Sequence, residues 1–152
     1  MTKDEYWMGL ALSLARSAKH IDEVPVGAVI VHQSGLVSTG FNLREKTQDP
    51  SAHAEMIAIR KASKILGSWR LGECSLYVTL EPCLMCAGAI YQSRFKKVVF
   101  GASDPKGGAM GSLYSIQEDE RLNHRFEVSS GVLADECSNI LSSFFRAKRK
   151  KK

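Results

Sequence analysis

The N-terminal part of the chain has apolar residues at helical spacing. Between residues 4 and 19 one stripe of such residues recurs with the period of an α-helix. Its members are Trp7, Leu10, Ala11, Leu14 and Ala18. Asp4 is a suitable N-cap residue, because its side-chain oxygens can accept hydrogen bonds from the free N–H groups of a first turn. The pattern therefore predicts a helix over residues 4–19.

The spacing then changes to short continuous apolar runs. Residues 26–31 are apolar and lie between Pro25 and the polar segment 33–35, which is typical of a strand followed by a tight turn. Residues 36–41 are expected to return as the second strand of a hairpin. Residues 42–50 are polar and end in an Asp-Pro pair, which favours a turn before a helix.

The rest of the chain alternates predicted strands and helices. The predicted elements are a helix over 51–66, a strand over 75–79, a helix over 83–93, a strand over 97–100, a loop over 102–112, a short helix over 115–121, a strand over 125–129 and a helix over 134–147. This order after a hairpin favours an α/β domain, and the strand–helix–strand unit should make its two strands parallel. We therefore expect a three-layer α/β/α sandwich with a five-stranded mixed sheet and helices on both faces.

Length and composition fit a single globular domain. The chain has 152 residues, of which 44% are hydrophobic and 24% are charged. These values exclude a disordered or fibrous protein. No apolar run approaches the roughly 20 residues needed to span a bilayer, and the N-terminus lacks the pattern of a secretory signal peptide. We therefore expect a cytoplasmic protein that does not bind membranes.

The positive charge is concentrated at the C-terminus. The net charge is +5, from 21 basic and 16 acidic residues. Residues 146–152 hold six of the 21 basic residues, so residues 1–145 carry 15 basic against 16 acidic residues, a net of −1. Two hypotheses remain for this basic tail: it improves solubility, or it binds nucleic-acid phosphates. We expect a nearly neutral domain over 1–145 and a basic tail over 146–152.

Two segments carry residues that bind metals. His53 follows the Asp-Pro turn at the start of one predicted helix, and Cys83 and Cys86 lie in the first turn of another. Residues three apart on a helix share a face, and a helix N-terminus favours the thiolate that binds metal. Two thiolates and one imidazole are the ligands of a catalytic zinc site, which leaves its fourth position for water. Cys74 or Cys137 could instead complete a four-ligand structural site.

Glu55 indicates the chemistry of this site. Two residues beyond His53, it should diverge from the metal ligand on a regular helix. It can instead stand beside a metal-bound water, whose pKa zinc lowers to roughly 7, and take its proton. Two other interpretations stay open: His53 and Glu55 are ordinary helix-start residues, or the Cys83-x-x-Cys86 pair is redox-active.

The combination of His-x-Glu with Pro-Cys-x-x-Cys is the signature of the zinc-dependent nucleobase deaminases. The resemblance extends over essentially the whole chain and is narrower than this superfamily. It is carried by 24–29, 53–55, 76–90, 98–102 with Asp104, 111–113, and the segment from the Leu-Ala-Asp-Glu-Cys of 133–137 to the Phe-Phe-Arg of 144–146. These motifs make the chain similar to the bacterial tRNA-specific adenosine deaminases.

The resemblance implies a cytidine deaminase-like fold, one Zn²⁺ per subunit and a homodimer. It also implies a reaction: a zinc-bound hydroxide, generated by Glu55, converts adenosine to inosine at the wobble position of an arginine tRNA anticodon, within the anticodon stem-loop. The resemblance further assigns substrate contacts. Asn42 would contact the base or its sugar, the backbone at Ala54 its edge, and Asp104 the neighbouring nucleotide. Phe145 and Arg146, with the following basic residues, would hold the RNA.

Two other functions share these features. A deaminase of a free base or nucleoside, such as guanine or cytidine, would use the same zinc core and would not need residues 146–152. A zinc-stabilised RNA-binding module without catalysis would need the metal ligands but not Glu55. The carboxylate at that position therefore favours an enzyme.

Overall fold

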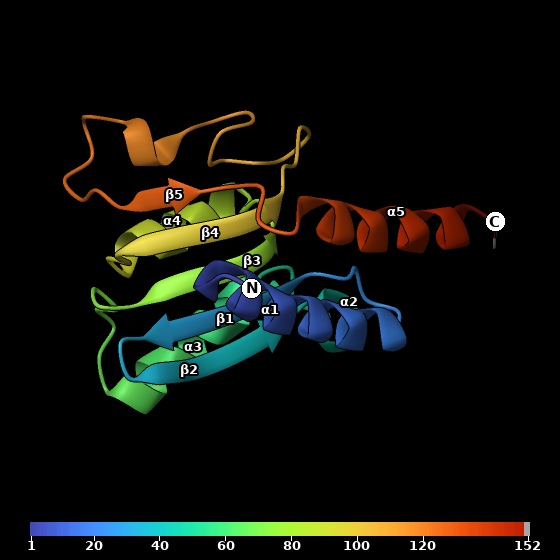
Figure 1. The fold of residues 1–152 in the computed structure, drawn as a ribbon, viewed down its shortest axis with the longest axis horizontal. Coiled ribbons are helices and arrows are strands. Elements are labelled where there is room, and N and C mark those ends of the chain that lie inside the picture. The colour runs from blue at the N-terminus through green and yellow to red at the C-terminus, as the bar shows by residue number, and fades with distance from the viewer. Residues whose placement is uncertain (151–152) are drawn as a thin grey trace.

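One mixed sheet forms the centre of the molecule (Figure 1). The structure is a computed structural model, and it describes residues 1–150. The five strands are β1 (Gly27–His32), β2 (Gly35–Phe41), β3 (Ser75–Leu80), β4 (Lys97–Ala102) and β5 (Glu127–Ser129). They are ordered β2-β1-β3-β4-β5 across the sheet. The five-stranded mixed sheet predicted from the sequence is therefore confirmed.

The hairpin and the parallel unit meet at the middle of this sheet. Strand β1 pairs antiparallel with both β2 and β3, while β3 pairs parallel with β4 and β4 with β5. The parallel pairing of β3 and β4 follows from the helix that connects them, as predicted. This order places the C-terminal end of β3 and the helix that follows it beside the hairpin.

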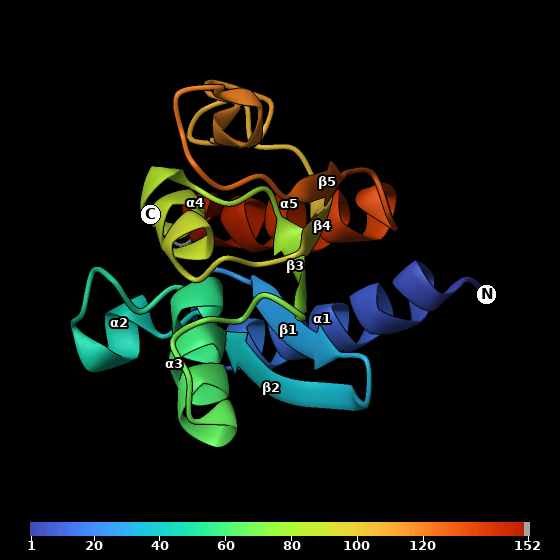
Figure 2. The ribbon, with the colours of Figure 1, turned by 90° about the vertical axis from the view of Figure 1, so that its left-hand side faces the viewer.

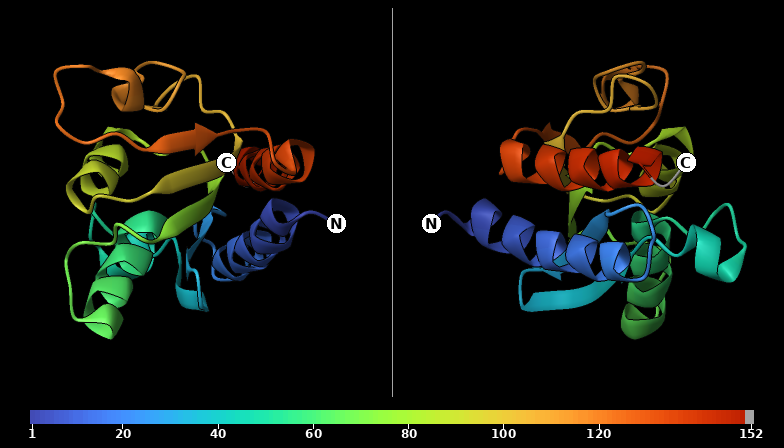
Figure 3. Two further views of the ribbon diagram at one scale, coloured as in Figure 1. Left: turned by 60° about the vertical axis from the view of Figure 1, so that its left-hand side comes forward. Right: turned by 90° about the vertical axis from the view of Figure 1, so that its right-hand side faces the viewer.

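Helices cover both faces of the sheet. They are α1 (Lys3–His20), α2 (Arg44–Thr47), α3 (Ala54–Leu66), α4 (Leu84–Gln92) and α5 (Ala134–Lys150), with a 3₁₀ turn, η1, at Ile116–Glu118. Helices α3 and α4 lie on one face, and α1 and α5 lie on the other (Figure 3, left). A view along the strands shows α3 and α4 on the same side of the sheet (Figure 2). The predicted three-layer arrangement is confirmed.

Alternation along the central strands supplies both layers of the core. In β1, Ala28 and Ile30 belong to the hydrophobic cluster that contains α3 and α4. Val29 and Val31 belong to the cluster on the α1 and α5 side. Successive side chains of a strand point to opposite faces, so a run that is apolar throughout is what a strand covered on both faces requires.

The first helix begins earlier than its pattern suggested. Its N-cap is Thr2 rather than Asp4: the Glu5 N–H donates to Thr2 Oγ1 at 3.1 Å, and the Thr2 N–H donates to the Glu5 carboxylate at 2.9 Å. This reciprocal pair leaves Asp4 free for another role. Its carboxylate accepts a hydrogen bond of 2.7 Å from the Tyr77 hydroxyl, which ties α1 to β3.

Further boundaries differ from the predictions. The short helix expected over 115–121 is only the 3₁₀ turn η1, and the strand expected over 125–129 is limited to Glu127–Ser129. The helix expected from residue 51 begins at Ala54, and the polar segment 42–50 contains the single turn α2. The last helix continues to Lys150, so the described part of the basic segment is helical. Lys151 and Lys152 lie outside the described residues. Within the described part of the chain, no helix is both long and apolar enough to cross a membrane.

Candidate metal centre and active site

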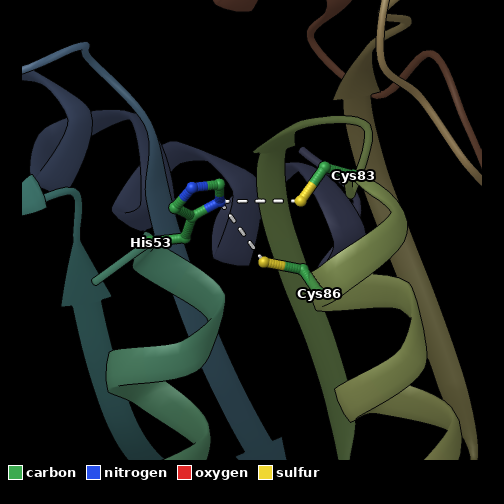
Figure 4. Close-up of side chains that lie close together, drawn as sticks. All are labelled: His53, Cys83 and Cys86. Carbon is green, nitrogen blue, oxygen red and sulfur yellow. Dashed lines mark hydrogen bonds between the residues drawn. The ribbon is translucent and has the colours of Figure 1, made fainter. Parts of the chain in front are cut away.

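The starts of α3 and α4 bring the predicted ligands together (Figure 4). His53 is the N-cap of α3 and Cys83 is the N-cap of α4, both in extended backbone, and neither side chain makes a capping hydrogen bond. Their side chains therefore remain available to a metal. Cys86 lies in the first turn of α4 and is fully buried.

The turn before α3 fixes the position of His53. Asp49 Oδ1 accepts hydrogen bonds from the N–H of Ser51 at 2.8 Å and from its hydroxyl at 2.7 Å. An aspartate that bonds a residue two positions on forms a rigid local turn. The Asp-Pro signal in the sequence therefore marks the loop that delivers the histidine to the site.

The distances fit a tetrahedral zinc ion. His53 Nδ1 lies 3.6 Å from Cys83 Sγ and 3.5 Å from Cys86 Sγ. Zinc bonds of about 2.3 Å to sulfur and about 2.05 Å to nitrogen, at a tetrahedral angle, separate those two atoms by about 3.6 Å. Within the described residues this is the one cluster of three or more such side chains with metal-binding spacing.

The thiols are prepared for metal binding. The hydrogen bond from the Cys86 thiol, followed by that from His53, lowers the pKa of Cys83 to about 4. The same contact with Cys83, together with burial, raises the pKa of Cys86. These shifts favour the thiolate form of Cys83, and the thiolate is the form that ligates zinc.

The other two cysteines are elsewhere in the fold. Cys74 belongs to the core beneath α3 and α4, and Cys137 belongs to the core on the opposite face. Burial raises the pKa of both thiols. The described residues thus supply three protein ligands, the set of a catalytic rather than a structural zinc site.

Glu55 stands in the first turn of α3, beside the ligands but outside their set. It is 4% exposed, and this burial raises the pKa of its carboxyl group to about 7. The charges on Cys83 and His53 also act on its pKa, which places it within their electrostatic reach. A buried carboxyl group next to a metal site is equipped to accept and return a proton.

A cavity of about 130 Å³ opens onto the metal site. Its walls combine apolar side chains, which suit the face of a base, with polar groups that can read its edges. The lining residues are Val24, Val26, Asn42, Arg44, His53, Ala54, Glu55, Leu80, Glu81, Cys83 and Asp104. Among the described residues, the buried Asn42 Oδ1 has no hydrogen-bond partner, so the pocket presents an unused acceptor.

The predicted substrate contacts divide into two groups. Asn42, Ala54 and Asp104 line the cavity together with His53 and Glu55. Phe145 and Arg146 lie on α5, away from that lining. Phe145 is 43% exposed, and Arg146 lines a separate groove between α1 and α5.

Several lining residues carry no metal-ligand or catalytic motif of their own. In the sequence, Val24 and Val26 have the pattern of core residues at the start of a strand, and Arg44 has that of a polar loop. Glu81 is the most informative of them. It is buried and immediately precedes the Pro-Cys pair. The signal in the sequence that could have identified Glu81 is a charged residue directly after an apolar strand.

Comparisons with known proteins agree with this geometry. The sequence model of the cytidine and deoxycytidylate deaminase zinc-binding region matches residues 1–102. The chain therefore belongs to the zinc-dependent cytidine and deoxycytidylate deaminase family. Its relatives include tRNA-specific adenosine deaminases. One from Bacillus subtilis is 54% identical over 152 residues, covering 100% of this chain and 94% of the relative. One from Haemophilus influenzae is 51% identical over 150 residues, covering 98% and 87%.

Solved structures of deaminases also superpose on this chain. A structure from a study of A-to-I editing by tRNA:A34 deaminases at the wobble position superposes with a TM-score of 0.86 and 43% identity. It covers 90% of this chain and 99% of its own. A guanine deaminase from Nitrosomonas europaea is more distant, with a TM-score of 0.80, 26% identity, and coverage of 95% and 85%.

Proposed function

We propose that this protein deaminates adenosine to inosine at the wobble position of an arginine tRNA anticodon. The observation that carries this proposal is the cluster of His53, Cys83 and Cys86 with the buried Glu55 beside it. His53, Glu55 and Cys83 also line a pocket. The relatives named tRNA-specific adenosine deaminase support adenosine in tRNA as the substrate. The A34 deaminase structure supports the wobble position.

The reaction replaces the amino group on C6 of adenine by oxygen. One water is consumed, a C6–O bond forms, the C6–N6 bond breaks, and ammonia leaves. His53, Cys83 and Cys86 would hold the zinc, which when bound supplies a water of lowered pKa. Glu55 would take one proton from the attacking water and pass it to the ring nitrogen N1, and would then take the second proton from the oxygen now bonded to C6 and pass it to the departing amino group.

The remaining pocket residues orient the nucleotide. Val24, Val26 and Leu80 form an apolar wall against which an aromatic base can lie. We assign Asn42 to the base or its sugar, the backbone at Ala54 to the edge of the base, and Asp104 to the neighbouring nucleotide. A base in an anticodon loop is already single-stranded, so turning it into this pocket costs less than opening a duplex.

The RNA outside the pocket needs other contacts. We assign Phe145, Arg146 and the basic residues that follow to the anticodon stem-loop, because they combine an exposed aromatic ring with positive charge. On this proposal, 1–145 is the deaminase domain and 146–152 is a basic RNA-binding end. A tRNA substrate also places the enzyme in the cytoplasm.

We further propose that the enzyme works as a homodimer. Beside the metal site, Leu84 is 57% exposed at the start of α4, with Met85 next to it. Leu113 and Tyr114 are also exposed, on the loop that contacts the same site. Apolar groups gathered in this way are typical of a protein interface. Light scattering should give twice the 16.8 kDa of one chain.

The decisive experiment compares substrates. Zinc-loaded enzyme is incubated with an arginine anticodon stem-loop, with the same stem-loop carrying its adenosine one position away, and with free adenosine and free guanine. Inosine should form only at the wobble position. Rapid turnover of free guanine without reaction on RNA would instead identify a free-base deaminase. Binding of the stem-loop without any inosine would indicate an RNA-binding module.

A further inference from the structure

Glu81 is a buried carboxylate that the reaction above does not use. It is 2% exposed and lies between the end of β3 and the Pro-Cys pair. Its Oε1 accepts hydrogen bonds from the Asp104 N–H at 2.9 Å and from the Ser112 hydroxyl. Its Oε2 accepts from the N–H groups of Met110 and Ser112, both at 3.0 Å. Every one of these donors belongs to the loop that follows β4.

The loop backbone presses directly against this carboxylate. A Cβ atom on Gly108 would lie 2.2 Å from the carboxylate carbon of Glu81, so only glycine fits there. The same stretch of loop is held by the Ala109 N–H, which donates to the Pro82 carbonyl at 2.9 Å, and by a bridge between Gly108 and Cys83. Glu81 is thus the centre of the contact between the loop and the metal-binding segment.

This contact fixes a wall of the pocket. Asp104 is the residue by which the loop lines the cavity, and Glu81 binds its backbone N–H. The Asp104 carboxylate in turn accepts hydrogen bonds from the N–H groups of Lys106 and Gly107, at 3.1 and 3.2 Å. The position of Asp104 therefore depends on an anchor outside its own loop.

Only a carboxylate satisfies all of these donors. Three backbone N–H groups and one hydroxyl converge on it, two on each oxygen. A glutamine of the same shape has one acceptor oxygen and turns an NH₂ group toward at least one N–H. A buried donor left without an acceptor is costly, so the loop would shift away from its anchor.

We propose that Glu81 is a positioning residue that sets the place of Asp104 at the pocket and, through it, the affinity for the RNA substrate. The inference rests on the proposed function, in which Asp104 contacts the nucleotide beside the target adenosine. Although Glu81 lines the cavity, both of its carboxylate oxygens are taken up by hydrogen bonds from the loop after β4. Its effect is therefore expected in KM for the stem-loop rather than in the chemical step.

The first arm of the test measures the anchor without any substrate. Hydrogen exchange of zinc-loaded Glu81→Gln is compared with that of wild type and of Glu127→Gln, a matched change at an exposed glutamate of β5. The amides of the peptide covering 104–112 should lose protection in Glu81→Gln alone, with zinc content unchanged. Unaltered protection of that peptide would overturn the proposal, whatever the enzyme's activity.

The second arm measures the consequence for the substrate. In Glu81→Gln, KM for the stem-loop should rise about tenfold, the effect of about 1.4 kcal/mol, with kcat nearly unchanged. In an Asp104→Ala background the same substitution should add little, because the residue it positions is already gone. Equal effects in both backgrounds would show that Glu81 acts only on general stability and would refute the inference.

The two arms distinguish failure of the proposed function from failure of the positioning role proposed for Glu81. If wild type deaminates no stem-loop, the proposed function fails, and the exchange arm still tests the anchor. If Glu81→Gln does not fold, Ser112→Ala replaces it. This change removes one donor to the carboxylate and should raise KM about threefold, as loss of a single hydrogen bond predicts. A KM equal to that of wild type in Ser112→Ala would then count against the proposal.

Discussion

At the scale of single residues, the proposed site assigns metal binding and proton transfer to different side chains. His53, Cys83 and Cys86 meet at distances that match a zinc ion. Glu55 lies outside that set because it follows the histidine by two positions on the first turn of α3. Removing the carboxylate should therefore remove catalysis without removing the metal.

This separation predicts the behaviour of Glu55→Ala. We expect zinc content of about one ion per chain, as in a wild-type site with three protein ligands, but inosine formation lowered by at least about 10²-fold, as for loss of a general base. Elemental analysis and single-turnover assays on the stem-loop test both parts. Loss of zinc from the variant would mean that Glu55 is itself a ligand or shapes the site.

The cysteines offer a matched comparison. Cys86→Ala removes a proposed zinc ligand, whereas Cys74→Ala removes a buried thiol of the core. Cys86→Ala should purify with little zinc and no activity, and Cys74→Ala should keep both and lose only stability. Metal content and thermal unfolding with and without a chelator provide the readout. Full zinc loading of Cys86→Ala would disprove the ligand assignment.

At the scale of elements, the site depends on where helices begin. The sequence pattern places helices near His53 and Cys83, but it does not show that both residues are N-caps in extended backbone. Periodicity locates the apolar face of a helix, whereas the cap depends on local hydrogen bonds. Because periodicity does not reveal such hydrogen bonds, Asp4 was predicted as the N-cap, whereas Thr2 is the N-cap and Asp4 lies in the first turn of α1.

Elements without a hydrophobic pattern were the least predictable. The turn α2 buries none of its residues and is held by Glu23, whose carboxylate accepts from the N–H groups of Glu45 and Lys46 at 3.0 and 2.7 Å. The loop after β4 is likewise anchored by Glu81. Both contacts join residues more than 20 positions apart, so no local pattern reveals them. The strands and long helices, which are defined by apolar spacing, were predicted in the correct order and place, although several of their ends differ.

Packing of α3 against β2 allows a prediction at this scale. A Cβ atom on Gly40 would lie 2.5 Å from the carbonyl oxygen of Ala54, at the start of α3. Gly40→Ala should therefore push away the helix start that carries Glu55. We expect a loss of about 1–3 kcal/mol, as for other overpacked cores, with weaker zinc binding. Denaturant unfolding and competition with a chelator measure the two effects.

Gly9→Ala is the matched control for this substitution. Gly9 lies within α1, and nothing approaches its added Cβ within 4 Å. Alanine there should stabilise the fold by about 0.5–1 kcal/mol through its better helix propensity, with unchanged zinc affinity. If Gly40→Ala behaved like Gly9→Ala, the close contact between β2 and α3 would not control the site.

At the scale of the whole molecule, the sheet order collects the functional groups at one end. The starts of α3 and α4 lie side by side (Figure 4). Helix α5 extends beyond the end of the sheet toward which β3 and β4 point (Figure 1). As far as Lys150, the basic end of the chain is thus a continuation of α5 rather than a separate tail. Lys148 ties it to the loop after α1 through an ion pair of 2.7 Å with Asp22.

The net charge gives the last prediction. Outside residues 146–152 the chain is close to neutral, so phosphate binding should depend on this end. The triple variant R146Q, R149Q and K150Q keeps the Lys148 ion pair and removes three exposed cations. If each neutralises one phosphate, the slope of log K against log salt for stem-loop binding should become shallower by about 2, at about 0.7 per contact.

The variant K3Q, K64Q and R125Q removes the same charge from exposed positions elsewhere and should leave the slope unchanged. Equal slopes for both variants and wild type would show that the basic end serves solubility rather than RNA binding.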